Sequence, residues 1–141
     1  GIAAKIVGEE GADSPILFNI AGKAADGFII VTNLDRDDKR PFVQEYLKQY
    51  KERYGIDTCM TGASGYDAFL IIINGIKTAG SLEPKKIRDA IAATKDFDGM
   101  TGVIKGFTPE REVVKPLQVQ IVKDGNFRHY AVIDDPELIA Q

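Results

Sequence analysis

Residues 66–79 constrain the fold of this chain more than any other segment. The spacing predicts a helix with apolar side chains almost all round it, among them Phe69, Ile72 and Ile76, and Gly80 marks its end. A helix that is apolar on every side is normally buried inside a fold. The segment therefore predicts a central helix, which needs a sheet of several strands to cover it.

Strand patterns elsewhere are few. Residues 5–7 form a short apolar run, and residues 28–32 form a continuous, β-branched run typical of a strand buried on both faces. Residues 117–121 alternate between apolar residues and glutamine, residues 123–126 (KDGN) are typical of a tight turn, and residues 127–133 form the return strand of a hairpin. Strand–helix alternation followed by a late hairpin predicts an α/β fold, but one short of strands for its central helix.

Three further helices are predicted, over residues 16–21, 41–54 and 84–91, with glycine or proline at their boundaries. Residues 56–61 are expected to be extended, and the glycines of residues 98–102 are expected to break the chain. The tyrosines of the middle helix are interpreted as half-buried packing residues, not as a binding stripe: Tyr46, Tyr50 and Tyr54.

The composition excludes several classes of function. The 141 residues include 18 Lys and Arg against 21 Asp and Glu, a net charge of −3, which disfavours nucleic-acid binding. No apolar run approaches the roughly 20 residues of a membrane-spanning helix. With one cysteine and one histidine, the chain has no Cys/His site for zinc or haem, and we expect neither a metal nor a cofactor.

Catalytic motifs are also absent from the sequence. Cys59 lies in an apolar context typical of an inert buried thiol, and His129 is interpreted as a surface or edge residue of the last strand. The sequence contains no phosphate-binding loop, nucleophile elbow or metalloprotease motif. We therefore predict that the chain is not an enzyme.

Two acidic segments are candidates for binding. Glu9 and Glu10 lie in a turn between a strand and a helix, where open α/β sheets bind ligands, and a carboxylate there could accept hydrogen bonds from an ammonium group. Pattern alone nevertheless favours a solvated turn. Asp35, Asp37 and Asp38 lack the glycine and distal glutamate of a calcium loop and are predicted to form a solvated loop.

Several segments, in their order and spacing, resemble a known family. They are residues 21–28, residues 41–55 (PFVQEYLKQYKERYG), residues 65–68 (GYDA), residues 79–91, residues 97–102 (FDGMTG) and residues 115–127. Together they are similar to the C-terminal part of the branched-chain amino-acid-binding proteins, which are type I periplasmic substrate-binding proteins of ABC importers.

The resemblance implies a two-lobed architecture. A complete member has two α/β lobes joined by three crossover strands and is more than twice this length, so the chain is expected to be a fragment. Residues 1–27 would be a remnant of the second lobe, residues 28–99 part of the first lobe, residues 100–116 a crossover, and residues 117–141 the hairpin that returns to the second lobe. The strands that the central helix needs would lie on the missing sequence.

The resemblance also implies a function. The complete protein would close over a small amino-acid-like ligand and present it to an ABC permease, as a secreted protein of the periplasm or the cell exterior. Glu10 takes the position of the family's ammonium-binding carboxylate, and Glu9 precedes it. Met60 and Thr61 lie where the family can place a side chain against the ligand's apolar end.

Other interpretations remain open at this point. The same fold serves as the ligand-sensing domain of receptors and regulators, and a small stand-alone α/β enzyme is a further alternative that the missing motifs disfavour. The chain is also expected to be inactive on its own, because the resemblance places the ligand's carboxylate-binding segments on missing sequence. We further expect self-association through unpaired edges of the strand at residues 28–32.

Overall fold

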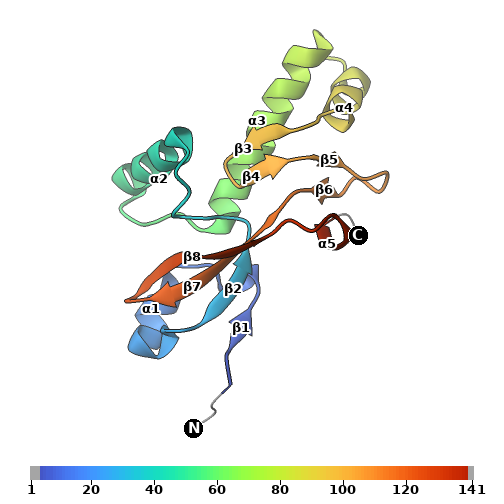
Figure 1. The fold of residues 1–141 in the computed structure, drawn as a ribbon. Coiled ribbons are helices and arrows are strands. Elements are labelled where there is room, and N and C mark those ends of the chain that lie inside the picture. The colour runs from blue at the N-terminus through green and yellow to red at the C-terminus, as the bar shows by residue number, and fades with distance from the viewer. Residues whose placement is uncertain (1–3, 140–141) are drawn as a thin grey trace.

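The computed structural model describes residues 4–139, so the outermost residues of the two end segments predicted above, 1–3 and 140–141, lie outside it. Figure 1 shows a chain in two parts that meet at a narrow waist. The first part is a sheet of four strands in the order β1-β2-β7-β8. Its strands are β1 (Val7–Gly8), β2 (Ile29–Thr32), β7 (Leu117–Lys123) and β8 (Asn126–Ile133). Strands β1 and β2 are parallel, whereas β7 is antiparallel to both of its neighbours.

One face of this sheet packs against α1 (Ile16–Ala21) and the short 3₁₀ helix Gly22–Ala25. The core contains Ile30, Val122 and Phe127, and the Phe127 ring lies 4.9 Å from that of Phe18. The predicted hairpin is confirmed, since Asp124 and Gly125 have φ values of 50° and 68°, as a tight turn between antiparallel strands requires.

The second part contains the longer helices. These are α2 (Pro41–Tyr54), α3 (Met60–Ala79) and α4 (Pro84–Ala92). The short α5 (Pro136–Ile139) follows β8 and lies near β5 and β6 (Figure 1). Leu34, Val43, Ala63 and Met100 form the buried core of this second part. Helix α2 matches its predicted bounds because Pro41 occupies its first turn and Gly55, with a φ of 73°, ends it. Its tyrosines stack along one side, with the Tyr46 and Tyr50 rings 5.9 Å apart.

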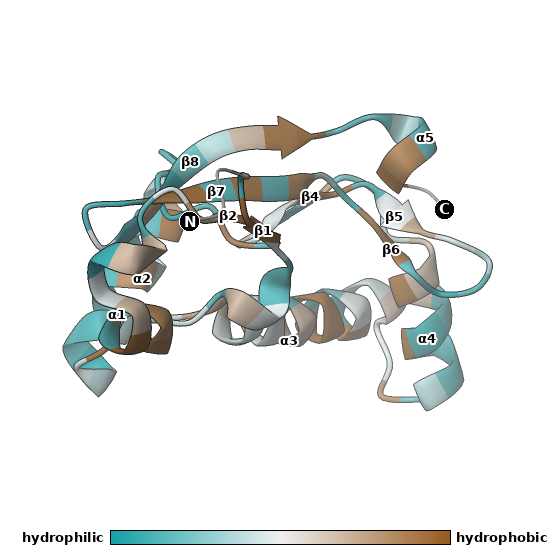
Figure 2. Cartoon of the chain, turned by 90° about the horizontal axis from the view of Figure 1, so that it is seen from below, coloured by the Kyte–Doolittle hydropathy of each residue, from teal (hydrophilic) through white to brown (hydrophobic). Residues whose placement is uncertain are grey.

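Helix α3 differs from the prediction in two ways. It begins at Met60, so residues 60–65 are helical and the expected extended segment ends earlier. It is also not buried all round: Ala63, Ile71 and Gly75 are buried, but Phe69 is 62% and Ile72 47% exposed. Figure 2 shows hydrophobic residues on α3 with pale and hydrophilic ones between them. The described residues therefore supply only part of the cover that this helix needs.

Two short ladders were missed at the sequence level. They are β3 (Phe97–Gly99) with β4 (Gly102–Ile104), and β5 (Gly106–Phe107) with β6 (Val113–Val114). Each strand has only two or three residues, which is too short for a period-2 pattern to be recognised. The glycines that were expected only to break the chain instead close the first of these hairpins.

One sheet contains strands from three of the segments that were predicted from the sequence. Strand β2 pairs with β1 on one side and β7 on the other, so it belongs to the same sheet as the N-terminal and hairpin segments, although residues 28–99 were assigned to the other lobe. The expectation that this strand has unpaired edges is wrong for the same reason. After β8 the chain leaves the sheet, and Asp134 pairs with Lys105. The division into lobes stays a prediction.

Candidate functional site

A cavity of about 410 Å³ lies where the two parts meet. Glu10 and Asn33 reach it from the sheet part, Met60, Ser64 and Asp67 from α3, and Thr101 and Lys115 from the segment that returns toward β7. Apolar side chains complete the wall: Ala68, Ile71, Ile104, Phe107 and Val113. The cavity thus combines charged and apolar groups from segments far apart in the sequence.

Glu10 begins the short 3₁₀ helix Glu10–Ala12 that follows β1. Its Oε2 accepts a hydrogen bond of 3.0 Å from Asn33 Nδ2, at the end of the neighbouring strand β2. The residue is exposed, so its carboxylate remains accessible to a ligand. Adjacent parallel strands thus deliver both the carboxylate and the amide that orients it.

The four residues predicted to bind a ligand separate into two pairs. Glu10 and Met60 line the same cavity, although 50 positions apart. Glu9 and Thr61 do not line it, and both are exposed. The Thr61 hydroxyl hydrogen-bonds to the sulfur of Met60 at 3.3 Å. The structure thus brings one candidate from each predicted segment to the cavity.

A buried carboxylate on α3 organises another wall of the cavity. Asp67, 3% exposed, accepts hydrogen bonds from the backbone amides of Met100 and Thr101, and its Oδ2 accepts a further one of 2.7 Å from Thr101 Oγ1. Gly99 packs against the same carboxylate. This network holds the β3–β4 turn on α3. Sequence reasoning missed it because Asp67 has no pattern that marks it as a long-range cap.

Lys115 is the second charged residue that the sequence did not single out. It is only 7% exposed, and its ammonium donates a hydrogen bond to Thr101 Oγ1. Burial lowers the pKa of Lys115 to about 8, although the negative charges of Asp67 and Glu10 attract its proton. The only sequence signal for a special role of Lys115 was its position directly before Pro116 and the apolar strand that begins at Leu117.

The acidic loop of residues 35–38 is not the solvated loop that was predicted. Asp35 accepts hydrogen bonds from Gln120 Nε2 at 3.0 Å and shares one of 2.7 Å with His129 Nδ1. Asp37 accepts a hydrogen bond from the backbone amide of His129. The loop is therefore tied to the edge strand β8, where His129 lies half exposed as expected of an edge residue.

Asp38 in the same loop pairs with Arg40. Burial raises the pKa of Asp38, but the hydrogen bonds and charge of Arg40 outweigh that effect and leave the pKa below its usual value. The Arg40 guanidinium also donates hydrogen bonds to the backbone oxygens of Gly99 and Met100. The loop thus also holds the β3–β4 turn.

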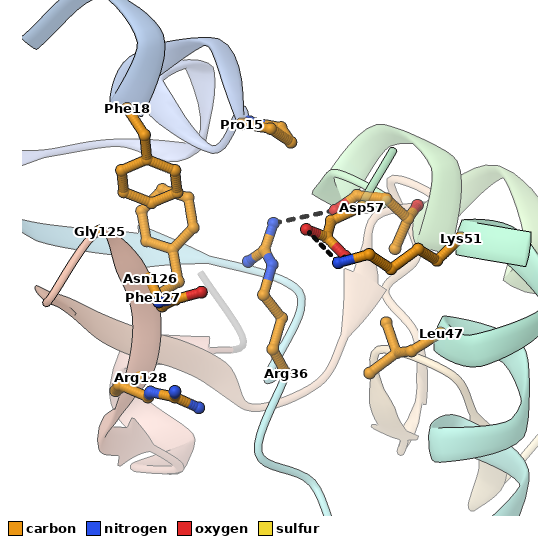
Figure 3. Close-up of a pocket in the computed structure, with 11 residues that line it drawn as sticks. Pro15, Phe18, Arg36, Leu47, Lys51, Asp57, Gly125, Asn126, Phe127 and Arg128 are labelled. Atoms are coloured by element: carbon orange, nitrogen blue, oxygen red, sulfur yellow. Dashed lines mark hydrogen bonds and ion pairs between the residues drawn. The ribbon is translucent and has the colours of Figure 1, made fainter. Parts of the chain in front are cut away.

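A second cavity, of about 240 Å³, lies around Arg36 (Figure 3). Arg36 extends between the rings of Phe18 and Phe127 on one side and the exposed pair Lys51–Asp57 on the other. Its guanidinium donates to the Thr58 carbonyl at 3.1 Å and to Gln120 Oε1 at 2.9 Å, and it pairs with Asp13. The cations that line this cavity already have partners, so the first cavity is the better candidate for a ligand.

The described residues contain neither a metal-binding group of side chains nor a membrane-spanning helix. Within residues 4–139, no group of His, Cys, Asp and Glu side chains is arranged to hold a metal ion. None of the helices in that range is long and apolar enough to cross a membrane. Cys59 is partly buried at the start of α3.

Comparison with known proteins finds a matching family and similar solved structures. The sequence model of a family described as periplasmic binding protein matches residues 1–126. A leucine-binding protein of Thermotoga maritima is 32% identical, with a TM-score of 0.83 over 97% of this chain and 39% of its own length. A protein of Rhodospirillum rubrum, provisionally named as a branched-chain amino acid ABC transporter, is also 32% identical, with a TM-score of 0.75 over 92% of this chain and 38% of its own.

A third solved structure shares the fold. The branched-chain amino acid transporter substrate-binding protein of Streptococcus pneumoniae, solved in complex with isoleucine, is 24% identical, with a TM-score of 0.78 over 94% of this chain and 37% of its own. This chain therefore spans about two fifths of the length of each of these proteins.

Proposed function

This chain belongs to the periplasmic binding proteins, and on that premise we propose that it is the C-terminal part of a solute-binding protein that delivers an amino-acid-like ligand to an ABC importer. The observation that carries the proposal is the cavity of about 410 Å³ between the two parts, which contains both Glu10 and Met60. A ligand held there contacts both parts at once. Such a ligand stabilises a closed arrangement of the two parts over an open one.

Glu10 is the proposed partner of the ligand's ammonium group. Its carboxylate is accessible, lies at the end of β1, and is oriented by Asn33. A charge-assisted hydrogen bond is stronger than a neutral one, and closure of the cavity removes competing water. The acidic group therefore selects ligands that carry a positive charge at one end.

Met60 supplies the apolar contact in this proposal. A thioether side chain is flexible and polarisable, so it adapts to ligand side chains of different shape. The neighbouring structures named above include a leucine-binding protein and a complex with isoleucine. An amino acid, including those with branched aliphatic side chains, is accordingly the proposed ligand class.

The proposed setting follows from this role. The complete protein acts outside the cytoplasmic membrane, in the periplasm or at the cell exterior, and its partner is an ABC permease. It binds and releases its ligand without chemical change. The chain of residues 4–139 would contribute one wall of the cleft, and the segments that complete it would come from the rest of the protein.

Calorimetry tests this proposal directly. The complete protein that contains this segment is titrated with a panel of aliphatic, polar and aromatic amino acids. We expect one saturable site per molecule for at least one member of the panel, with no turnover of that ligand. Absence of binding by every amino acid would contradict the proposal.

A further inference from the structure

Two hydrogen-bond donors in the wall of the Glu10 cavity are incompletely used. The hydroxyl oxygen of Ser64 is buried and has no hydrogen-bond partner within residues 4–139. The Lys115 ammonium makes one hydrogen bond in that range, to Thr101 Oγ1. An ammonium carries three N–H donors, so two of them remain on Lys115. Buried polar groups in folded proteins are nearly always paired, so both side chains call for an explanation.

Asp67 does not accept a hydrogen bond from Lys115. Both oxygens of Asp67 already accept hydrogen bonds, from the backbone amides of Met100 and Thr101 and from the Thr101 hydroxyl. Asp67 and Glu10 act on Lys115 through space, and its pKa is nevertheless lowered to about 8 by burial. The positive charge of Lys115 is thus only partly compensated at neutral pH.

Both residues line the cavity that the proposed ligand occupies. Ser64 lies one helical turn after Met60 on α3, on the same face of that helix. Lys115 comes from a different element, the link between β6 and β7. Donors from two separate elements converge on the cavity that also holds Glu10, so the cavity carries a negative group and a positive group in one space.

We propose that Ser64 and Lys115 form a subsite for an oxygen of the ligand, either a carboxylate or an amide oxygen. The inference rests on the proposed function and makes its ligand class narrower: a small molecule with an ammonium group for Glu10 and an oxygen acceptor for Ser64 and Lys115. Two oxygens of an amino acid have this chemistry, the α-carboxylate and an oxygen in the side chain.

The test uses calorimetry on the complete protein with four probes: leucine, glutamine, glutamate and isovalerate. Leucine has only the α-carboxylate, glutamine and glutamate add a side-chain oxygen, and isovalerate has a carboxylate without an ammonium group. The variants are Ser64→Ala and Lys115→Met. Lys105→Met is the matched control, because Lys105 pairs with Asp134 and does not line the cavity.

We expect Lys115→Met to weaken binding about 10- to 100-fold and Ser64→Ala about 2- to 10-fold, with Lys105→Met unchanged. Equal losses for leucine and glutamine assign the subsite to the α-carboxylate. Losses confined to glutamine and glutamate assign it to the side-chain oxygen. Lys115→Arg, which keeps the charge, should retain part of the affinity, and thermal unfolding of each variant shows whether it is folded.

Wild-type affinity of folded Ser64→Ala and Lys115→Met variants for every probe would overturn the inference while leaving the proposed function intact. The same experiment can also show failure of the Glu10 role while the oxygen subsite is retained. If leucine binding depends on Lys115 but is indifferent to Glu10→Gln, the oxygen subsite stands and the ammonium role of Glu10 fails. A wild-type protein that binds none of the four probes and no other amino acid of the panel contradicts both.

Discussion

Arg36 and Asp13 form an ion pair that joins the two parts of the molecule. The Asp13 side chain is completely buried and that of Arg36 is 15% exposed. The Thr32 hydroxyl also donates to the Asp13 carboxylate, so the carboxylate is bonded on both sides. The same guanidinium donates to the Thr58 carbonyl, directly before α3, and therefore links the sheet part to the helical part.

Replacing Arg36 by Met should strongly destabilise the fold. The change leaves the buried carboxylate of Asp13 without its counter-charge, which typically costs about 3–5 kcal/mol. Lys51→Met is the matched control from the same cavity, because the Lys51–Asp57 pair is exposed and should contribute about 1 kcal/mol or less. Urea denaturation measures both free energies of unfolding, and equal losses would show that burial does not set the strength of the Arg36 pair.

Glu10→Gln in the complete protein should weaken binding of an amino acid by about 10- to 100-fold. The variant keeps the shape and removes the charge, and a hydrogen bond to a charged group contributes about 1.5–3 kcal/mol. Stability should change little because Glu10 is exposed. Glu9→Gln is the control, since Glu9 does not line the cavity. Titration calorimetry that finds the same loss for both would indicate a general electrostatic effect.

Lys115 should make the free energy of unfolding depend on pH. Its pKa is lowered from 10.5 to about 8 in the folded chain. Between these values the unfolded chain binds more protons than the folded chain, so stability rises with pH, by about 3 kcal/mol at most. Below pH 8 both states are protonated and this contribution no longer changes. The difference between wild type and Lys115→Met, measured by denaturation from pH 7 to 10.5, should show this slope, and a flat difference would refute it.

The isolated chain should associate with itself, and α3 should carry the contact. Phe69 is 62% and Ile72 47% exposed on one helix, and exposed apolar surface of this kind favours association. Phe69→Glu should shift the chain toward the monomer, whereas Tyr54→Glu, which changes an exposed residue of α2, should not. Light scattering over a range of concentrations measures both, and a wild-type monomer at high concentration would contradict the prediction.

The isolated chain should also bind free amino acids weakly. It spans about two fifths of the length of the proteins that it matches, and the proposed function assigns part of the cleft to the rest of the protein. Binding at micromolar Kd corresponds to about −8 kcal/mol. Calorimetry that finds such affinity for leucine or glutamine in the 141-residue chain would show that the described cavity is sufficient by itself.

Local sequence signals determined the elements that have strong end markers or a long repeating pattern. Pro41 and Gly55 bound α2 as predicted, because proline suits the first helical turn and glycine tolerates the left-handed conformation at the end. The hairpin of β7 and β8 was likewise predictable from its alternation and its Asp124–Gly125 turn. The family followed from the order of several such segments, and the match over residues 1–126 confirms it.

The tertiary structure decided which polar residues are buried and what they contact. Gln120 alternates with apolar residues and looks like the outer face of a strand. It is nevertheless fully buried, and its amide hydrogen-bonds to both Asp35 and Arg36 in the loop that follows β2. Lys115 and Asp67 are 48 positions apart in the sequence, and both line one cavity because tertiary packing brings their segments together. Periodicity and end signals act over a few neighbouring residues, whereas these contacts arise only when distant segments pack together, and no local pattern encodes them.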